Sequence, residues 1–302
     1  MCEIMSGINR IICFIKNTTV KQRVITISLT VTAAIISVVL ILVIKEITSY
    51  SEIGMIAEEV NEYDEYGISK PRISQHEYNL ENITTENGYK YYYENGQRKS
   101  TAGIDVSYAQ KNIDWTKVKA AGIDFAMIRL GYRGYQTGLL NLDEFYHKNI
   151  QEASAAGVET GVYFFSQAVT EKEAEEEADF VIKHIQNFNI TYPVVFDWEV
   201  ITQSPARTDN LDGKMLTRCC IAFCKKIEEA GYTPMVYASL NLLRKQYDKY
   251  ELKELTGYDL WLAEYKEYPE FPYEFKMWQY TDKGIIDGIE HPTDIDMYFN
   301  VN

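Results

Sequence analysis

From residue 103 onward, short apolar runs alternate with segments in which apolar residues recur at helical spacing. Uninterrupted or alternating apolar runs predict strands, and apolar residues three and four positions apart predict helices. Three of the helical segments end in Ala-Gly, at Gly122, Gly157 and Gly231, and an apolar run follows each one. Glycine just beyond a helix supplies the left-handed conformation that often ends it. The pattern therefore predicts repeated strand–helix units.

Eight apolar runs are predicted to be strands. They are residues 103–107, 125–132, 159–166, 192–200, 233–239, 259–265, 275–280 and 294–299. Strands that alternate with helices form parallel sheets, and eight of them in one domain predict an α/β fold with a closed β/α barrel of the TIM-barrel type. In such barrels the reacting groups lie at the carboxyl ends of the strands.

The fourth of these runs ends in two acids one residue apart, Asp197 and Glu199. Side chains at positions i and i+2 of a strand leave on the same face, so both carboxylates are expected to project together. Taken alone, the pair is equally compatible with two solvated acids where a strand meets its loop. A close pair in which each charge raises the cost of ionising the other suits glycoside hydrolysis, because that reaction needs one protonated and one ionised carboxyl group.

Further polar side chains fall on the other predicted strands. Asp105 and Asp294 lie on the first and the last strand, which barrel closure brings together, so both acids are expected beside the pair. Tyr163 and Tyr237 are expected to hydrogen-bond to a bound sugar or to the catalytic acids. For Tyr237, simple packing inside the barrel is an equally good interpretation.

Residues before the barrel predict a different environment. Residues 24–44 form an uncharged apolar run long enough to cross a bilayer as a helix, and no Ala-x-Ala cleavage pattern follows it. Basic residues precede the run, which predicts residues 1–23 in the cytoplasm and the rest outside, in a single-pass membrane protein. Residues 45–100 are expected to form an extracellular stalk with a short aromatic, hairpin-like segment at residues 87–96, and residues 101–302 the catalytic domain. The hairpin-like segment is compatible with a small wall-binding element, but a strand that caps the following domain is favoured.

Composition narrows the range of partners. The chain has 302 residues and a formal net charge of -14, which argues against nucleic-acid binding and gives no electrostatic attraction to an anionic polymer. Cys219, Cys220 and Cys224 fall within one predicted helix, where buried free thiols are favoured over a bridge between Cys220 and Cys224. Neither the cysteines nor the four histidines have metal-site spacing, so we expect no metal and no cofactor.

Several motifs, in this order, resemble the glycoside hydrolase family 25 lysozymes, the Chalaropsis-type N-acetylmuramidases. The resemblance begins with Gly103-Ile-Asp-Val-Ser-Tyr-Ala-Gln110 and Ile113-Asp-Trp115. It continues through Tyr163-Phe-Phe165, the Asp197-x-Glu199 strand, Leu260-Trp-Leu-Ala263 and Trp278-Gln-Tyr280, and it closes with Asp294-Ile-Asp-Met-Tyr-Phe299. The motifs cover residues 103–299.

The resemblance implies a flattened, irregular β/α barrel that lacks several helices. It also implies cleavage of the β-1,4 bond between N-acetylmuramic acid and N-acetylglucosamine in peptidoglycan. Glu199 matches the general acid of the family, Asp197 its partner acid, and Asp105 and Asp294 the acids that line the same groove. Within the Trp278-Gln-Tyr280 motif, Trp278 is expected to stack on a sugar ring and Gln279 to bind substrate.

Two departures from the family pattern affect the expected substrate preference. Lys111 stands where the family usually has glycine, and Asp296 stands where asparagine is common. Neither departure removes a catalytic carboxylate.

Two mechanistic roles for Asp197 remain open. Asp197 either attacks the anomeric carbon or orients the acetamido group of the substrate while that group attacks; the second is favoured because closely spaced acids on one strand resemble those of substrate-assisted glycosidases. Two other functions also remain open: an inactive, membrane-held module that binds peptidoglycan, and a hydrolase of another N-acetylated glycan. A bacterial enzyme anchored through residues 24–44 is expected to remodel the wall locally or to open it for an envelope-spanning complex.

Overall fold

The structure of the chain is a computed structural model that describes residues 40, 41, 45, 74–203, 205–243 and 250–301. The chain divides into two compact units, Met1–Met55 and Ile56–Asn302. Of the predicted membrane span at residues 24–44, only Leu40 and Ile41 are among the described residues. Within the part of the chain that the structure describes, no helix is both long and apolar enough to cross a membrane.

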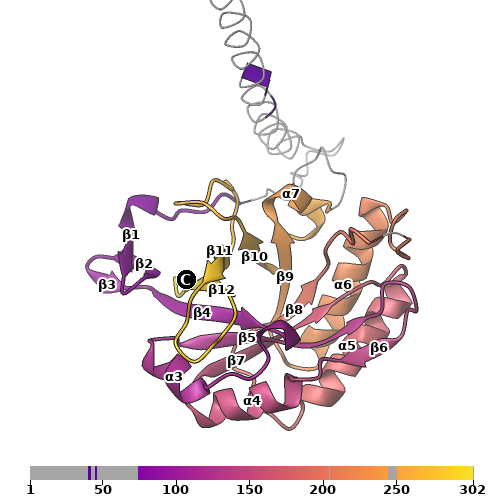
Figure 1. The fold of residues 1–302 in the computed structure, drawn as a ribbon. Helices are drawn as coiled ribbons and strands as arrows, with labels where there is room; N and C mark the ends of the chain where they lie inside the picture. The colour runs from indigo at the N-terminus through magenta and orange to yellow at the C-terminus, as the bar shows by residue number, and fades with distance from the viewer. Residues whose placement is uncertain (1–39, 42–44, 46–73, 204, 244–249, 302) are drawn as a thin grey trace, which may run out of the picture. The chain divides into compact units, whose positions relative to one another are not determined.

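Eight strands of the second unit close into a barrel, in the order β4-β12-β11-β10-β9-β8-β7-β5, with β4 paired to β5 (Figure 1). This arrangement confirms the predicted barrel, and each strand overlaps one of the eight apolar runs. The strands are β4 (Ser100–Val106), β5 (Phe125–Arg133), β7 (Glu159–Phe165), β8 (Val194–Asp197), β9 (Pro234–Ser239), β10 (Asp259–Ala263), β11 (Met277–Gly284) and β12 (Thr293–Phe299).

The last strand runs against the others. β12 is antiparallel to both β11 and β4, whereas the other neighbouring strands of the barrel are parallel, so the prediction of a wholly parallel sheet is wrong for β12. The cause is the β11–β12 connection, residues 285–292, which contains no helix. Without a crossover helix the chain turns straight back, which gives an antiparallel pair. One end of the barrel, here called the mouth, therefore combines the carboxyl ends of seven strands with the amino end of β12; the opposite end is the base.

Helices cover only part of the barrel (Figure 1). Asp114, Thr170 and Asp212 cap the amino ends of α3, α5 and α6 with their side chains, as short polar residues do at helix starts. No helix lies in residues 264–276, between β10 and β11. The helices are α3 (Trp115–Ala120), α4 (Tyr146–Ala155), α5 (Glu171–Ile185), α6 (Gly213–Glu229) and the short α7 (Leu240–Leu243); η2 (Tyr108–Gln110), η4 (Leu252–Glu254) and the edge strand β6 (Leu140–Leu142) lie in the connections.

The three cysteines of α6 lie on its buried side. Cys219, Cys220 and Cys224 are free thiols with no exposed surface. This confirms the interpretation of buried free thiols, and it makes the cysteines part of the apolar face that α6 packs against the barrel.

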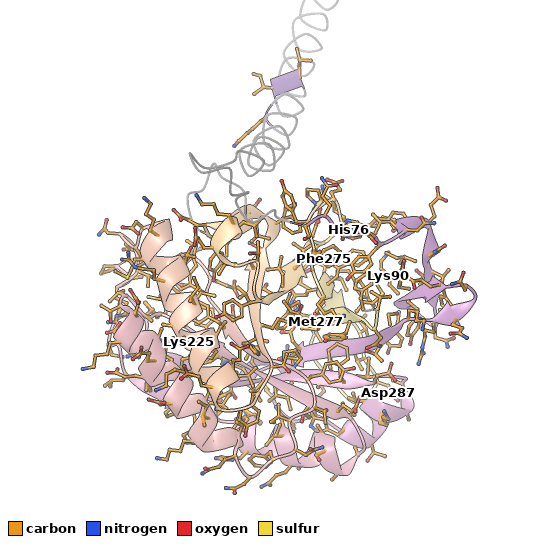
Figure 2. All side chains as sticks on the ribbon, turned by 180° about the vertical axis from the view of Figure 1, so that it is seen from behind. His76, Lys90, Lys225, Phe275, Met277 and Asp287 are labelled. Atoms are coloured by element: carbon orange, nitrogen blue, oxygen red, sulfur yellow. The ribbon has the colours of Figure 1, made fainter. Side chains whose placement is uncertain are left out.

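Residues 74–99 cover the side of the barrel that has few helices. After η1 (Leu80–Asn82), three antiparallel strands, β1 (Ile83–Glu86), β2 (Tyr89–Glu94) and β3 (Gln97–Arg98), form a small sheet whose middle strand lies against β4 and β12. The ring of Tyr78 stacks on Phe299 at 4.1 Å between centroids, and its hydroxyl donates to the Phe275 carbonyl. Figure 2 labels His76 and Phe275, whose rings meet edge to face at 5.4 Å.

The aromatic strand β2 lies over the barrel, as the capping interpretation of residues 87–96 predicts. Residues 74–86 of the predicted stalk, 45–100, pack there as well, because Tyr89, Tyr91 and Tyr92 of β2 are buried where a helix is missing. The hairpin-like signal is explained by tight turns at Asn87-Gly88 and Asn95-Gly96, where all four residues have positive φ. Residues 46–73 of the predicted stalk lie outside the described residues.

Candidate active site

The two acids of β8 occupy different environments. β8 ends at Asp197, so the strand is shorter than the predicted run 192–200 and Glu199 lies in the loop beyond it. Asp197 is 4% exposed, whereas Glu199 is open to solvent. The expectation that both acids leave one strand face is therefore replaced by a buried acid at the strand end and an accessible acid on the following loop.

Burial raises the pKa of Asp197 well above its usual range, and the charge of Glu199 raises it further. The guanidinium of Arg129 on β5 acts in the opposite direction and favours the ionised form. Among the described residues, no donor lies within hydrogen-bond distance of Asp197 Oδ1, although this atom is buried. A buried oxygen without a protein donor is costly in a folded protein, which marks this side chain as a candidate for contact with a ligand.

Glu199 also has a raised pKa. Although the side chain reaches solvent, the surrounding protein removes enough water from its carboxyl group to raise the pKa, and the charge of Asp294 adds to the effect. Asp294, at the start of β12, is thus the charged group that acts most on Glu199. Both acids of the Asp197–Glu199 pair consequently hold protons at higher pH than free carboxyl groups do.

Asp105 and Asp294 face each other across two neighbouring strands. They are paired residues in the antiparallel register of β4 and β12, which places the two side chains on one face. Burial, followed by the charges of Asp294 and Asp296, raises the pKa of Asp105 well above its usual range. The pKa of Asp294 rises to about 6, mainly through burial. The reversal of β12 is therefore what brings these acids together at the mouth.

Gln279 on β11 links the acids to two tyrosines. Its Nε2 donates to Asp105 Oδ2 at 2.7 Å, and its Oε1 accepts from the hydroxyls of Tyr237 at 3.2 Å and Tyr265 at 2.8 Å. These bonds fix which end of the amide faces the acid. Tyr265 had not been identified from sequence, since it lies in the predicted run 259–265 like any strand aromatic. In the structure it follows β10 at the mouth, with 51% of its surface exposed.

Tyr163 and Tyr237 are both buried in the upper interior of the barrel, at 9% and 8% exposure. Their rings meet Trp261 edge to face, at 6.1 and 4.9 Å between centroids. Burial and the nearby carboxylates raise the pKa of each phenol well above its usual range. Both hydroxyls therefore stay protonated near neutral pH; that of Tyr237 donates to Gln279, and that of Tyr163 can donate to a bound sugar.

Trp278 does not lie in the mouth. It is fully buried, and its indole N–H donates to the Glu264 carbonyl at 2.8 Å. Met277 and Gln279 on either side point into the barrel, so the alternation along a strand turns Trp278 outward. There it packs below Lys90 of β2, whose Nζ lies 5.6 Å from the ring centre. The prediction that Trp278 stacks on a sugar is therefore wrong.

Asp296 is a further buried acid that the sequence showed only as a departure from a family pattern. It has no exposed surface, and Trp261 Nε1 donates to its Oδ1 at 2.9 Å. Burial and the charge of Asp294 raise its pKa well above the usual range. Asp296 is thus a fifth carboxyl group at this end of the barrel, beneath the four predicted ones.

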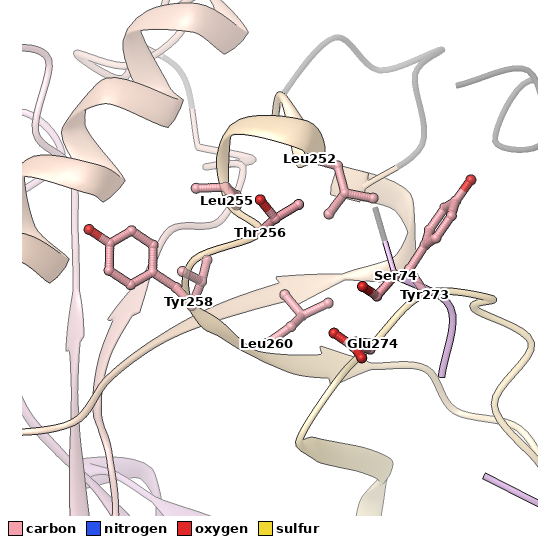
Figure 3. A pocket seen from close by; sticks show the side chains of 9 residues that line it. Ser74, Leu252, Leu255, Thr256, Tyr258, Leu260, Tyr273 and Glu274 are labelled. Carbon is pink, nitrogen blue, oxygen red and sulfur yellow. The ribbon is translucent and has the colours of Figure 1, made fainter. Parts of the chain in front are cut away.

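Two surface hollows differ in their distance from the acids. Figure 3 shows a partly open hollow of about 190 Å³ on the outer face of β9 and β10, where Val236 and Leu260 line it. None of the five acids belongs to it. A more open groove of about 740 Å³ lies between Asn112–Asp114 and the β11–β12 loop, next to the ends of the two strands that carry Asp105 and Asp294. In the described part of the chain, no group of three or more His, Cys, Asp or Glu side chains is arranged to hold a metal ion.

The site combines a buried acid, an accessible acid with a raised pKa and hydroxyl donors around them. Such a set moves protons to and from a bound substrate and stabilises positive charge that develops between the acids. Two-carboxylate sites of this kind perform glycoside hydrolysis.

Comparisons with known proteins agree with this chemistry. The model of the glycosyl hydrolases family 25 matches residues 104–289. The autolytic lysozyme of Clostridium acetobutylicum is 25% identical over 198 residues, which cover 65% of this chain and 55% of the lysozyme.

Two solved structures share the fold. One is the autolysin LytC of Streptococcus pneumoniae in complex with a synthetic peptidoglycan ligand, with a TM-score of 0.59 and 26% identity over 72% of this chain and 52% of LytC. The other is the spore cortex lytic enzyme SleM of Clostridium perfringens, with a TM-score of 0.58 and 24% identity over 69% of this chain and 70% of SleM. The chain spans about half the length of the lysozyme and of LytC.

The family model covers more than half of the chain, and its residues include the barrel strands from β4 to β11. The chain therefore belongs to the glycosyl hydrolases of family 25 and is a glycosidase.

Proposed function

We propose that the enzyme is an N-acetylmuramidase that cleaves the β-1,4 bond between N-acetylmuramic acid and N-acetylglucosamine in peptidoglycan. The observation that carries the proposal is the pairing of buried Asp197 with accessible Glu199 beside the facing acids Asp105 and Asp294. The autolytic lysozyme among the relatives and the peptidoglycan ligand bound to LytC support the choice of polymer.

Glu199 is the general acid in this mechanism. Its accessible carboxyl group is the one that a glycosidic oxygen reaches from solvent, and its pKa is already raised. A sugar chain laid over Glu199 would exclude water from it and raise that pKa further, so that the proton is held until it passes to the leaving oxygen.

Asp197 orients the acetamido group of the substrate. In the ligand-free site, burial favours the protonated form of Asp197, so the charge of Arg129 and a hydrogen bond from the substrate must favour ionisation. Asp197 Oδ1, which has no donor among the described residues, would accept the acetamido N–H. That bond turns the acetamido oxygen toward the anomeric carbon, and the ionised carboxylate stabilises the positive charge of the cyclic intermediate.

The direct test uses Glu199→Gln with Glu175→Gln, on the exposed face of α5, as the matched control. With purified peptidoglycan, Glu199→Gln should lower the release of reducing ends by about 1,000-fold, within the range that loss of a general acid gives, while the control retains parent activity. Mass spectrometry of the parent digest should find muramic acid at the reducing ends. Full activity in Glu199→Gln would refute the role of Glu199, and N-acetylglucosamine at the reducing ends would refute the bond assignment. A parent protein that fails to clear a peptidoglycan zymogram would support the inactive binding module instead.

The role of Asp197 has its own test. A muramoyl thiazoline mimics the cyclic intermediate of acetamide participation, so it should inhibit competitively and bind more tightly than a disaccharide product. Mass spectrometry of the enzyme during turnover should find no glycosyl adduct. An adduct on the peptide that contains Asp197 would instead establish direct attack.

We also propose that residues 24–44 anchor the enzyme in the cell membrane with residues 1–23 in the cytoplasm, so that hydrolysis remodels the wall locally. The uncharged length of the segment and the basic residues before it support this topology. In cell fractionation the tagged protein should sediment with membranes and be degraded by external protease once the wall is removed. Recovery of the whole protein in the soluble extracellular fraction would refute the anchor.

A further inference from the structure

Arg129 lies at the mouth among the acids, on a distorted part of β5. It is in register with Tyr163 of β7, and the register slips between Arg129 and Gly131. Irregularities of this kind re-aim a side chain and are frequent beside active sites. Gly131 permits the distortion, because a Cβ there would stand 2.2 Å from the Asn141 carbonyl oxygen. The charge of Arg129 acts on both Asp197 and Tyr163, which places its guanidinium near the reacting groups.

Two exposed tyrosines hold the guanidinium. Its central carbon lies 4.7 Å from the ring centre of Tyr108 in η2 and 5.5 Å from that of Tyr132 in β5. The tyrosines are 51% and 36% exposed, whereas the Arg129 side chain is 16% exposed. Aromatic contacts of this kind fix the plane of a guanidinium and limit its hydration. The group is therefore preorganised rather than free to turn in solvent.

Asp143 occupies one edge of the guanidinium. Nε and Nη2 of Arg129 lie 2.8 and 2.7 Å from Asp143 Oδ2. The backbone N–H groups of Tyr108 and Phe145 also donate to this carboxylate, so its charge is shared among several donors. Among the described residues, no side chain or backbone group accepts a hydrogen bond from Arg129 Nη1. The pair thus leaves one cationic edge available at the mouth.

We propose that Arg129 recognises a carboxylate on the saccharide, namely the free lactyl carboxylate of a muramoyl residue from which the peptide has been removed. The inference rests on the proposed muramidase function and adds its substrate preference. A planar guanidinium binds a carboxylate through two parallel charge-assisted hydrogen bonds and through a Coulomb attraction that a neutral amide does not provide. Strands whose lactyl groups still carry peptides offer only an amide at this position, so an amide-hydrolysing reaction must precede efficient cleavage.

The overall charge of the protein also favours such a contact. The net charge of -14 repels an anionic glycan, and five of the carboxyl groups lie at the mouth. The protein charge therefore gives no attraction at long range, and a cation at contact distance helps to hold an acidic saccharide. Arg129 has the position and the fixed orientation that this task requires.

The test measures ligand binding to the 302-residue chain in mild detergent. The chain carries Glu199→Gln, which prevents turnover. Two tetrasaccharides of alternating N-acetylglucosamine and N-acetylmuramic acid are compared by calorimetry: one with free lactyl carboxylates, the other with lactyl N-methylamides that mimic the peptide bond. The carboxylate ligand should bind about 10- to 100-fold more tightly, the range that one hydrogen bond to a charged group gives. In Arg129→Gln the two affinities should fall within about 2-fold of each other, and Arg129→Lys should lie between.

Each outcome decides a separate point. Equal affinities in the protein with Arg129 intact would overturn the proposal, and this result needs no change at position 129, so misfolding of a variant cannot hide it. A preference that persists in Arg129→Gln would assign recognition to another group. If a folded Arg129→Gln variant lost affinity equally for both ligands, Arg129 would be only a positioning residue for Asp197. Absence of binding by either ligand to the protein with Arg129 would refute the proposed function, and the inference with it.

Discussion

The molecule contains two groups of buried acids that differ in how they are paired. Glu177 of α5 is fully buried, yet Arg133 Nε donates to one of its carboxyl oxygens at 2.7 Å and the Ser166 hydroxyl to the other at 2.6 Å. At the mouth, Asp197 has an oxygen with no donor among the described residues, and Asp105 has another acid directly opposite it in the register.

The difference in pairing distinguishes an acid that stabilises the fold from the acids that take part in the reaction. Glu177 and Arg133 join β5 to α5 and are satisfied within the fold, so the pair supports the wall of the barrel. The charged mouth acids raise the free energy of the folded protein, because among the described residues Asp197 Oδ1 has no donor, Asp105 has only the Gln279 amide, and burial favours neutral carboxyl groups over charged ones. Unsatisfied buried acids of this kind persist where a substrate completes the site.

The largest effect is expected at Asp197, where a substitution should lower activity but not stability. Asp197→Asn should lower kcat by about 100- to 10,000-fold, the range for loss of one catalytic group. Its free energy of unfolding at pH 7 should equal or exceed that of the parent, since a poorly solvated carboxylate is replaced by a neutral amide. Hydrolysis assays and urea unfolding measure the two quantities. Asp287→Asn, on the exposed β11–β12 loop, is the control and should change neither. A marked loss of stability in Asp197→Asn would show that this acid is structural, like Glu177.

For the Glu177–Arg133 pair we expect the opposite, a loss of stability without a loss of activity. Arg133→Met leaves a buried acid without its cation, which should lower the free energy of unfolding by about 3–5 kcal/mol. Arg218→Met removes an ion pair with Glu171 whose side chains are more than half exposed, so it should cost less than ~1 kcal/mol. Urea unfolding of the two variants measures the contrast. The remaining folded fraction of Arg133→Met should keep its activity per molecule, and equal costs for both variants would contradict the distinction between the two acid groups.

The pH dependence of stability should reveal buried acids of both groups in the parent protein, Asp294 at the mouth and Glu177 on α5. Burial raises the pKa of Asp294 to about 6 and that of Glu177 to about 7, whereas unfolded carboxyl groups titrate near 4. The folded state therefore binds more protons than the unfolded state between about pH 4 and pH 7. The stabilisation that these protonated carboxyl groups provide is fully present below about pH 4 and is lost as the pH rises through about 6 to 7.

Asp294→Asn should reduce this slope. At pH 7 it should raise the free energy of unfolding by about 1–2 kcal/mol, after allowance for the partial solvent contact of Asp294. Near pH 4 the variant and the parent should have equal stability. Thermal unfolding in a pH series measures both points, with Asp287→Asn as the control. Stability that increases from pH 4 to pH 7 in the parent, with no change in Asp294→Asn, would contradict the raised pKa.

The smallest effect is expected at Tyr265. Tyr265→Phe removes the 2.8 Å hydrogen bond to Gln279, while Tyr237 still donates to the same oxygen. Because the Tyr265 side chain is half exposed, water replaces the lost donor and the free energy of unfolding should change by less than ~1 kcal/mol. Steady-state kinetics should find kcat/KM lowered by less than about 10-fold, chiefly through KM. A loss as large as that of Asp197→Asn would make Tyr265 part of the catalytic set.

The sequence was most informative where apolar runs were long. All eight barrel strands could be located because each must bury side chains, and closure of the first strand on the last then placed Asp105 beside Asp294. The direction of the last strand could not be read from the pattern, since a reversed strand and a parallel one have the same alternation. The predicted strands leave residues 281–293 between them, long enough for a crossover; the connection shrinks to 285–292 only because β11 continues to Gly284.

Individual side chains were harder to place than strands. Trp278 was assigned to the mouth because it belongs to a family-like motif, although its neighbours Met277 and Gln279 turn it to the outer wall. Arg129 was missed because a single charge within the apolar run 125–132 carries no sign of which end of the barrel it faces. Counting residues along the strand from the base would have located it, because Arg129 is in register with Tyr163, a residue that the sequence already singles out as a site candidate.

The reversal of β12 also determines how force would reach the domain. β12 ends at Phe299 in the base, where Asn300 N donates to the Lys99 carbonyl just before β4 begins, and Glu274 N holds the carbonyl of Ser74 nearby. Tension applied through Ser74 is therefore borne by hydrogen bonds at the base, with the length of the barrel between them and the carboxyl groups. A pull on the polypeptide at Ser74 would act on the wall at the end of the barrel opposite to Asp197 and Glu199.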